Sequence, residues 1–325
     1  MLIYTLRRLA YLVPTLLGIT IVTFVIISLA PGNPADVVRG TATVSPEVYD
    51  EMLRLYGLDK PVLVRYGIWL QRLVTFDFGS SFVDHRPVLA KVGERLPATL
   101  ILNGASLFLT LLFAIPFGLY SAVRQHSKFD KIGGTVLYML YSLPEFWVAL
   151  LLIMLFGVKL DLLPFIGIES LNAGELGFWA RLWDRLLHMV LPTVCLTYGA
   201  LAFLSRFVRG STLEVIHQDY IRTARAKGLD DSRVVYKHIF KNTLIPVVTL
   251  LGILLPTLIS GSIILEYIFS WPGIGQLFFN SVMSRDYPTV MGLSFITSLL
   301  VLLSTLVADL LYTWVDPRVS YERKN

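Results

Sequence analysis

The chain has 325 residues, of which 55% are hydrophobic and 16% are charged, and its formal net charge at pH 7 is +5. An ordinary soluble domain carries about 25% charged residues. The low charge content and the long apolar runs exclude such a domain and indicate a polytopic membrane protein. The single cysteine, Cys195, cannot form an internal disulfide, and we expect it to be a small buried residue.

We predict six membrane-spanning segments, all of them helices because a bilayer offers the backbone no hydrogen-bond partner. They cover residues 9–30, 98–122, 132–158, 186–205, 244–265 and 290–314. The first apolar run follows Arg7 and Arg8, as in a signal peptide. It is long enough to span, however, and no small-x-small cleavage site follows it, so we expect the first helix to be retained.

The orientation of the spans follows from the distribution of Lys and Arg. These residues are concentrated in the segments on the side of the two termini, above all in residues 206–243, so we predict that both termini are cytoplasmic. The chain then divides into four parts. They are an N-terminal tail with the first helix (1–30), an extracytoplasmic insert (31–96), a membrane core (97–315) and a cytoplasmic tail (316–325).

Within the insert, residues 52–74 have apolar residues at helical spacing, interrupted at residues 57–61 by Gly, Asp and Pro. We expect two short helices on the outer face. They form either a plain surface or a ledge that contacts a substrate-delivering protein.

The third span contains the sequence Ser142-Leu-Pro-Glu-Phe-Trp147. Proline inside a helix frees a carbonyl group and usually bends the helix, so we predict a kink at Pro144. Glu145 then lies near the middle of the membrane, where an acid normally faces a polar cavity or a partner. We consider two roles for Glu145: a group that lines a permeation path, or a hydrogen-bonded residue at a kink.

A polar, basic island separates the fourth and fifth spans. Asp219 is a candidate N-cap of a short helix, and Gly228 can end that helix in a left-handed conformation. Asp230, Asp231 and Ser232 can cap a second helix that leads into the next span. This arrangement suits a docking helix better than a catalytic site, although a basic loop is more often an ordinary solvated surface.

On the opposite side, Pro272 and Gly273 predict a tight reversal after the fifth span. Arg285 and Asp286 follow before the last span, where they can pair with each other or with a partner. A structural turn is the simpler interpretation of this segment.

Several segments resemble the membrane subunits of ABC importers, and more narrowly the B-type permease subunit of dipeptide and oligopeptide systems. The resemblance is carried by Tyr220-Ile-Arg-Thr-Ala-Arg-Ala-Lys-Gly-Leu229, by Glu266-Tyr-Ile-Phe-Ser-Trp-Pro-Gly-Ile-Gly275 and by Asp316-Pro-Arg318. It covers essentially the whole chain. Arg222 and Thr223 stand where the general pattern has Glu and Ala, and the peptide branch resembles this sequence at both positions.

The resemblance implies the six-helix architecture of a type I ABC importer permease, with the loop at residues 206–243 presenting a coupling helix to an ATPase subunit. The candidate coupling residues are Asp219, Tyr220, Ile221, Arg222, Thr223, Ala224, Arg225, Ala226, Lys227, Gly228 and Leu229. Pro144 and Glu145 are the candidates for the translocation path. The implied partners are a second permease, two ATP-binding subunits that hold ATP and Mg, an extracytoplasmic substrate-binding protein and the lipid bilayer of a bacterial inner membrane, with no nucleic acid. Peptides are the expected substrate, while nickel chelates, oligosaccharides and glutathione stay open.

The sequence lacks the motifs of common catalytic sites. It has no Gly-x-x-x-x-Gly-Lys-Ser/Thr phosphate loop, no His-Glu-x-x-His and no Gly-x-Ser-x-Gly, and its five histidines are scattered. We therefore expect a transport subunit without an enzyme activity, cofactor or metal of its own. A stand-alone secondary transporter is a distant alternative, because Glu145 is the one acid well inside a span and Asp309 lies near the end of another. An intramembrane hydrolase has no supporting constellation.

Overall fold

The structure is a computed structural model that describes residues 2–29, 54 and 59–315. Over these ranges the chain is helical and contains no β-strand, apart from an isolated bridge between Ser80 and Pro87. The predicted all-α fold class is confirmed.

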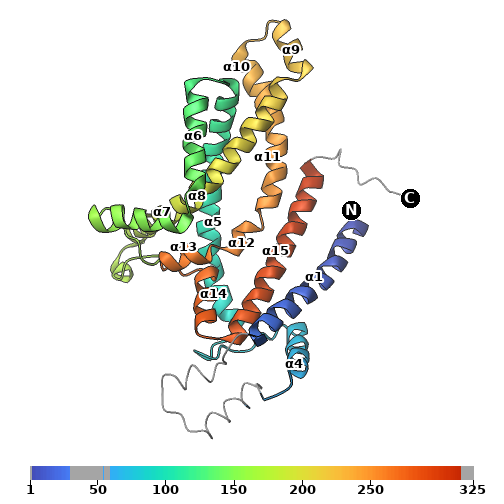
Figure 1. Ribbon diagram of the computed structural model, residues 1–325, viewed down its shortest axis with the longest axis vertical. Helices are drawn as coiled ribbons and strands as arrows, with labels where there is room; N and C mark the ends of the chain where they lie inside the picture. Colours follow the sequence, from blue (N-terminus) through green and yellow to red (C-terminus); the bar gives the residue numbers. More distant parts are fainter. Residues whose placement is uncertain (1, 30–53, 55–58, 316–325) are drawn as a thin grey trace.

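Two long helices form the centre of the molecule (Figure 1). They are α5 (Val88–Val123) and α8 (Phe178–Ile216), and they pack side by side. A Cβ atom on Gly118 of α5 would lie 2.6 Å from the Ser205 carbonyl oxygen of α8, so this approach requires glycine. Small residues are the usual means by which membrane helices pack closely. At about 1.5 Å per residue, both helices are longer than a hydrocarbon core of about 30 Å requires.

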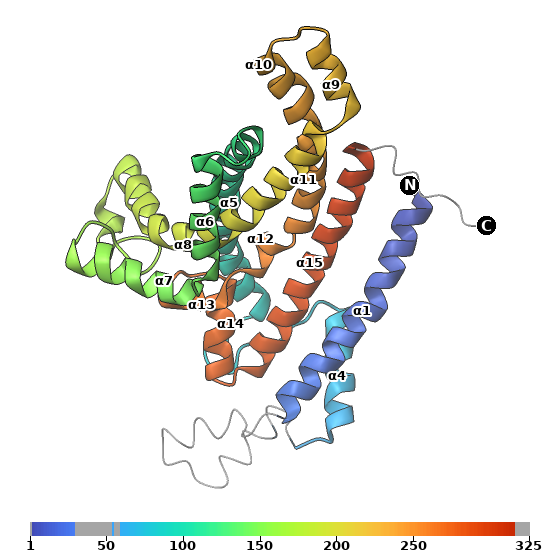
Figure 2. The ribbon, with the colours of Figure 1, turned by 45° about the horizontal axis from the view of Figure 1, so that its top comes forward.

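A second group of helices lies beside this pair. Helix α1 (Leu2–Leu29) packs along α15 (Tyr287–Val315), which also contacts α11 (Lys241–Leu254). Figure 2 shows α1 and α15 running side by side, with the short helix α4 (Val62–Val74) against the lower part of α1.

The third predicted span is two helices instead of one. It consists of α6 (Lys128–Ser142), followed by α7 (Glu145–Leu152) with the π-helical segment η1 (Ile153–Lys159). The two parts meet at an angle of 96°. The break falls at Leu143 and Pro144, because a proline ring excludes the helical hydrogen bond that would continue α6. The predicted kink is therefore present, and it is a sharp corner.

The fifth predicted span is also broken. Helix α11 is followed by α12 (Thr257–Ser260) and α13 (Ile263–Ile268), with a bend of 43°. Gly261 separates the two short helices with a φ of 66°, which favours glycine.

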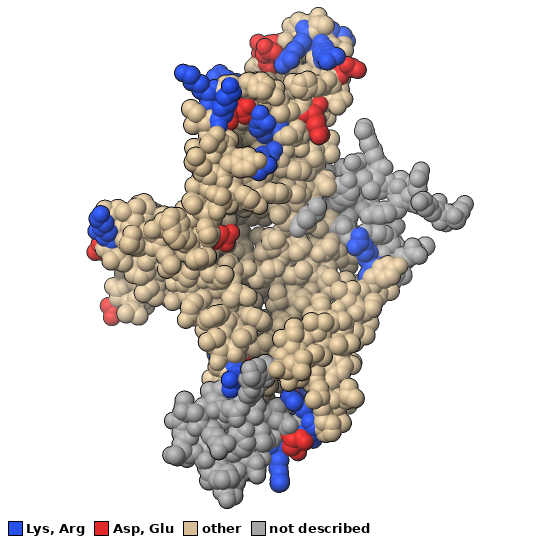
Figure 3. Space-filling model, viewed as in Figure 1, with Lys and Arg blue, Asp and Glu red and all other residues tan. Residues whose placement is uncertain are grey.

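By length and composition, four helices of the described chain can cross a membrane, and the two bent pairs bring the number to six. In the space-filling view, most Lys, Arg, Asp and Glu side chains gather at the two ends and at the projecting tip beside α7, and the surface between them carries few charges (Figure 3). Many apolar side chains in the spans are exposed, such as Phe108 at 63% and Met139 at 64%, as expected of surfaces that face lipid.

At the end of the molecule opposite the basic island, α4 and α14 (Ile274–Met283) pack with the start of α5. Their shared core consists of Leu73, Phe78, Val88, Val92, Ile274, Leu277 and Leu293. Helix α4 corresponds to the second of the two helices predicted in the insert. The first falls largely on residues 52–57, outside the described residues.

Candidate coupling surface and hinge

The basic island folds as a short helix held on an apolar base. Helix α9 (Asp219–Ala226) buries Ile221 completely and Ala224 almost completely. These two side chains pack with Val234 and Ile239 of the following segment. Val215 and Ile216 at the end of α8, and Leu119 of α5, complete the cluster. An isolated eight-residue helix is unstable in water, so this base is what keeps α9 folded.

The ends of α9 differ in one respect from the sequence prediction. The N-cap is Gln218, without a side-chain cap, and Asp219 is the first helical residue. The predicted capping role of Asp219 is therefore wrong. Its carboxylate lies near the positive end of the helix dipole and 3.5 Å from Arg222. It stabilises the first turn by charge and makes no capping hydrogen bond. Gly228 has a φ of 77°, as its predicted role in ending the helix requires.

The remaining face of α9 is polar and exposed. Tyr220 is 45% exposed, and the Arg222 side chain is 74% exposed. Arg225 lies with its Nε 3.4 Å from the Asp231 carboxylate, which ties α9 to the next turn. Helices α9 and α10 stand beyond the end of α8, farthest from α4 and α14 (Figure 1). An aromatic and two arginines are thus presented at one tip of the molecule.

The connection from α9 into the membrane core is also capped as predicted. Asp230 is the N-cap of α10 (Asp231–Arg233) and accepts a hydrogen bond from the Ser232 backbone N–H at 3.0 Å. Hydrogen bonds from Ser232 hold the pKa of Asp230 below its usual range. The π-helical segment η3 (Val234–Phe240) then leads into α11, with the Asn242 side chain donating to the His238 carbonyl oxygen at 2.6 Å.

The corner between α6 and α7 lies against α8. The Tyr198 hydroxyl of α8 donates a 2.8 Å hydrogen bond to the Leu143 carbonyl, which the helix break leaves without a helical partner. Glu145 opens α7 next to Gly199, where a Cβ atom would lie 3.8 Å from the Glu145 Oε1. Glu145 is exposed in this chain. The corner is therefore anchored to α8 through Tyr198, while the adjacent carboxylate stays accessible.

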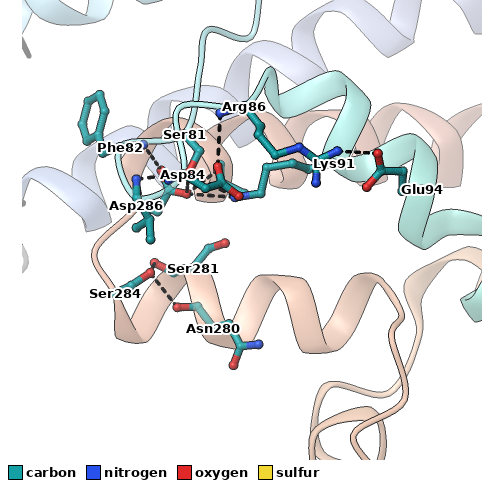
Figure 4. A network of polar contacts seen from close by, with 12 residues as sticks. Ser81, Phe82, Asp84, Arg86, Lys91, Glu94, Asn280, Ser281, Ser284 and Asp286 are labelled. Carbon is teal, nitrogen blue, oxygen red and sulfur yellow. Dashed lines mark hydrogen bonds and ion pairs between the residues drawn. The ribbon is translucent and has the colours of Figure 1, made fainter. Parts of the chain in front are cut away.

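A buried carboxylate fixes the other end of the molecule (Figure 4). Asp286 is 1% exposed and accepts hydrogen bonds from the Ser81 hydroxyl at 2.6 Å, the Phe82 N–H at 2.9 Å and the Thr289 hydroxyl at 2.6 Å. The Lys91 Nζ lies 3.6 Å from the same carboxylate. Asp286 thus joins the insert and the start of α5 to the α14–α15 turn. Of the two alternatives considered for Asp286, a pair with Arg285 or contact with a partner, the described residues show neither, because its contacts are with Ser81, Phe82, Lys91 and Thr289 of this chain.

Asp84 belongs to the same network. Its Oδ2 lies 2.9 Å from the Lys91 Nζ. Burial acts to raise the pKa of Asp84, but hydrogen bonds from Lys91, Ser81 and the Arg86 backbone outweigh it and lower the pKa to about 2. This carboxyl group is therefore ionised at every physiological pH.

A second buried acid, Glu266, holds the reversal after α13. It is 1% exposed and accepts from the Thr99 hydroxyl and the Gln276 N–H, each at 3.0 Å. A Cβ atom on Gly273 would overlap this carboxylate, which explains the glycine in the Pro-Gly turn. Trp271 is fully buried, with its indole N–H donating to the Ala98 carbonyl at 2.9 Å. The turn is a packed structural element.

Comparison with known proteins shows to which family the chain belongs. Residues 114–321 match the model of the family described as binding-protein-dependent transport system inner membrane component. Residues 1–103 match the N-terminal model of the same transport systems.

The chain belongs to this family.

Relatives align with this inner membrane component from end to end. The oligopeptide transport system permease protein AppB of Bacillus subtilis is 41% identical over 98% of the chain and 99% of its own length. The dipeptide transport system permease protein DppB of Escherichia coli K12 is 36% identical over 99% of the chain and all of its own length.

A solved structure shares the fold of this inner membrane component. It is a chain of the MetNI methionine ABC transporter in an inward-facing conformation, which is 19% identical and has a TM-score of 0.52. The likeness covers 70% of this chain and 97% of that one. At this level of identity it supports the fold alone.

The predicted coupling residues and the predicted residues of the translocation path lie in different parts of the structure. Residues 219–229 form one continuous segment at the tip, with Ile221 and Ala224 buried beneath it, whereas Pro144 and Glu145 lie at the corner of α6 and α7, midway along the molecule (Figure 1). In the described part of the chain, no group of three or more His, Cys, Asp or Glu residues is placed to hold a metal ion.

Sequence reasoning missed the roles of Glu266 and Asp286. The one sequence signal for these roles was that both acids stand next to a tight turn and close to a membrane segment.

Proposed function

We propose that the chain is a membrane-spanning permease subunit of an ATP-driven importer of peptides. The family membership supports the importer class, and the names of the oligopeptide and dipeptide permeases that align with the whole chain support the peptide class. The observation that carries the coupling role is α9, which is fixed to the core by Ile221 and turns Tyr220 and Arg222 outward.

The proposed assembly has four kinds of component. A second, similar permease completes the translocation path, and two ATP-binding subunits dock under α9 on the cytoplasmic side. A substrate-binding protein delivers the peptide on the other side. ATP and Mg belong to the ATP-binding subunits, and both termini of this chain lie in the cytoplasm.

The proposed mechanism uses α8 as a lever. Its last turn packs in the α9 base through Val215 and Ile216, and its Tyr198 holds the α6–α7 corner. Closure of the ATP-binding subunits shifts α9 and, with it, the end of α8. The shift reaches the corner at Leu143 and changes the tilt of α7, so that the path opens to one side at a time. ATP supplies the difference in free energy between the two states, because a ligand shifts such an equilibrium only by its differential affinity.

Glu145 is the proposed polar residue of the path. It is exposed beside Gly199, at the first turn of the helix that the lever tilts. A carboxylate at this position can bind the amino terminus of a passing peptide.

The test of coupling uses the complete transporter in proteoliposomes, with ATP-dependent uptake of a labelled peptide and ATP hydrolysis measured together. Tyr220→Ala and Arg222→Ala remove the exposed side chains of α9 without touching its buried base. Exposed Tyr and Arg at interfaces often contribute about 2 kcal/mol, which corresponds to roughly 30-fold in affinity. We expect uptake to fall by about this factor, with hydrolysis no longer stimulated by substrate.

The matched control is Arg124→Ala, an exposed arginine on the α5–α6 turn. It should transport like the wild type. Normal uptake in both α9 variants would refute the coupling role. If uptake of a nickel chelate, an oligosaccharide or glutathione replaces that of peptide, the substrate class is wrong while the importer role stands. ATP-independent uptake by this chain alone would favour a secondary transporter.

A further inference from the structure

A cavity of about 300 Å³ lies between α4, the end of α1 and the start of α15. Phe24 of α1 and Met291 of α15 form two of its walls. Both residues are within a few positions of the ends of apolar, span-length helices, which finish at Leu29 and start at Tyr287. The cavity therefore lies at the depth where the hydrocarbon core gives way to lipid headgroups.

The cavity carries an excess of positive charge. Arg54, Lys60, Arg65 and Arg72 line it, together with one acid, Asp77. The Asp77 Oδ1 accepts the Gly79 N–H at 2.9 Å. Among the residues that the structure describes, none forms an ion pair with Lys60, Arg65 or Arg72. Arg65 lies over the Phe24 ring at 5.9 Å, a contact that leaves its guanidinium N–H groups free to donate.

An unused hydrogen-bond donor points to the same chemistry. The Trp69 side chain also lines the cavity, and its buried indole N–H has no hydrogen-bond partner. An indole N–H is a donor without acceptor capacity, and a buried donor without a partner costs free energy. An anion in the cavity would satisfy this donor together with the two guanidinium groups.

The helix that supplies these groups has the character of an interfacial helix. Besides Arg65 and Arg72, α4 exposes apolar side chains, with Leu63 at 84% and Val74 at 76%, and Phe76 just beyond it is 66% exposed. A basic helix with exposed apolar residues and an interfacial tryptophan lies in the headgroup region of a bilayer. The neighbouring Tyr66 hydroxyl shares a 3.0 Å hydrogen bond with the Thr20 hydroxyl, which fixes α4 to α1.

We propose that this cavity binds the phosphate group of an anionic glycerophospholipid in the leaflet opposite α9. Arg65 and Arg72 would hold the phosphate oxygens by charge-assisted hydrogen bonds, with the Trp69 N–H as a third donor. The acyl chains would lie along the exposed apolar side chains of α4. The inference goes beyond the proposed function and does not rest on it, because it concerns a bound lipid and not the transported substrate.

The test is native mass spectrometry of the complete transporter in micelles with equal amounts of dioleoylphosphatidylglycerol and dioleoylphosphatidylcholine. We expect the wild type to retain phosphatidylglycerol selectively. The double variant Arg65→Gln/Arg72→Gln should lose this preference by about tenfold or more, since charge-assisted hydrogen bonds are lost. Trp69→Phe, which keeps an aromatic side chain but removes the N–H with the five-membered ring, should weaken retention by several-fold.

The control is Arg124→Gln/Lys128→Gln, which removes the same charge from the exposed turn between α5 and α6 and should retain the lipid like the wild type. Equal retention of both lipids by the wild type would overturn the proposal. Retention that is unchanged in Trp69→Phe and in the double variant would do the same. If inorganic phosphate raises the thermal unfolding temperature as much as phosphatidylglycerol does, the cavity is a free-anion site, and the lipid assignment is wrong.

Discussion

Replacing Asp130 by asparagine tests the polar contact that joins three helices near the α9 end of the molecule. Asp130 of α6 is 7% exposed and forms a two-point ion pair with Arg209 of α8, with N–O distances of 2.6 and 2.8 Å. It also accepts from the Ser121 hydroxyl of α5 at 2.5 Å and from the His126 N–H at 3.0 Å. The asparagine has nearly the same shape but lacks the charge.

The magnitude follows from burial and distance. Opposite unit charges 4 Å apart interact by about 4 kcal/mol at an effective dielectric constant of about 20. Breaking a fully buried ion pair costs about 3–5 kcal/mol. The Arg209 side chain is 33% exposed, so water replaces part of the interaction. We therefore expect Asp130→Asn to lower the free energy of unfolding by about 2–3 kcal/mol, and Arg209→Gln to do the same.

The assay is a double-mutant cycle, with the free energy of unfolding measured by titration with a denaturing detergent and followed by tryptophan fluorescence. Because both single variants remove the same contact, the double variant should be little less stable than either, with an interaction energy of about 2 kcal/mol. The exposed pair Arg86–Glu94 serves as the control, with an expected interaction energy below about 1 kcal/mol. An Asp130–Arg209 interaction energy below about 0.5 kcal/mol would refute the reasoning.

Three further predictions concern the end of α9, the contact of Tyr198 with the α6–α7 corner, and the loop between η1 and α8. Gly228→Ala should lower the free energy of unfolding by about 1 kcal/mol, because φ is 77° and the space for a Cβ is open. Gly228→Asn should cost less, and an equal cost for both, measured by the same titration, would contradict this reasoning. Tyr198→Phe leaves the Leu143 carbonyl without its 2.8 Å partner, so stability should fall by about 1 kcal/mol and hydrogen exchange should rise at the α6–α7 corner. Unchanged exchange there would count against the anchoring role. Hydrogen bonds from Arg181 and Arg185 lower the pKa of Glu169 from 4.5 to about 2. The resulting stability is present above pH 4.5 and is lost as the pH falls toward 2, a dependence that unfolding curves of Glu169→Gln should lack.

Local patterns in the sequence were sufficient for much of this fold. The apolar runs predicted the spans, because burial in lipid and backbone hydrogen bonding both act on contiguous residues. Pro144 predicted the break in the third span, since the effect of proline is confined to the adjacent turn. Gly228 predicted the end of α9 for the same reason. The size of the bend, 96°, depends on packing against α8 and was not predictable from residues 142–147.

The contacts that join distant segments could not be predicted from the sequence. Asp286 finds its partners in Ser81 and Phe82, some two hundred positions earlier, and Glu266 finds one in Thr99. Such pairs have no periodic pattern, and the acids alone are compatible with solvent-exposed turns. The N-cap of α9 was mispredicted for a related reason. The sequence alone does not determine the first residue of a helix, and a shift of one position makes Gln218 the N-cap and Asp219 the first helical residue.

The way α9 packs on its apolar base determines which neighbouring helices a displacement of α9 would affect. Sliding α9 off its base would expose Ile221, whose burial contributes about 1.5–3 kcal/mol, and would remove the contacts that keep so short a helix folded. The joint between α6 and α7 has no helical hydrogen bonds across Pro144 and is held to α8 by the Tyr198 contact. Between these two points α8 is continuous from Phe178 to Ile216. In the proposed mechanism, a displacement of α9 would therefore move α8 with it and reach the α6–α7 corner, beside the carboxylate of Glu145.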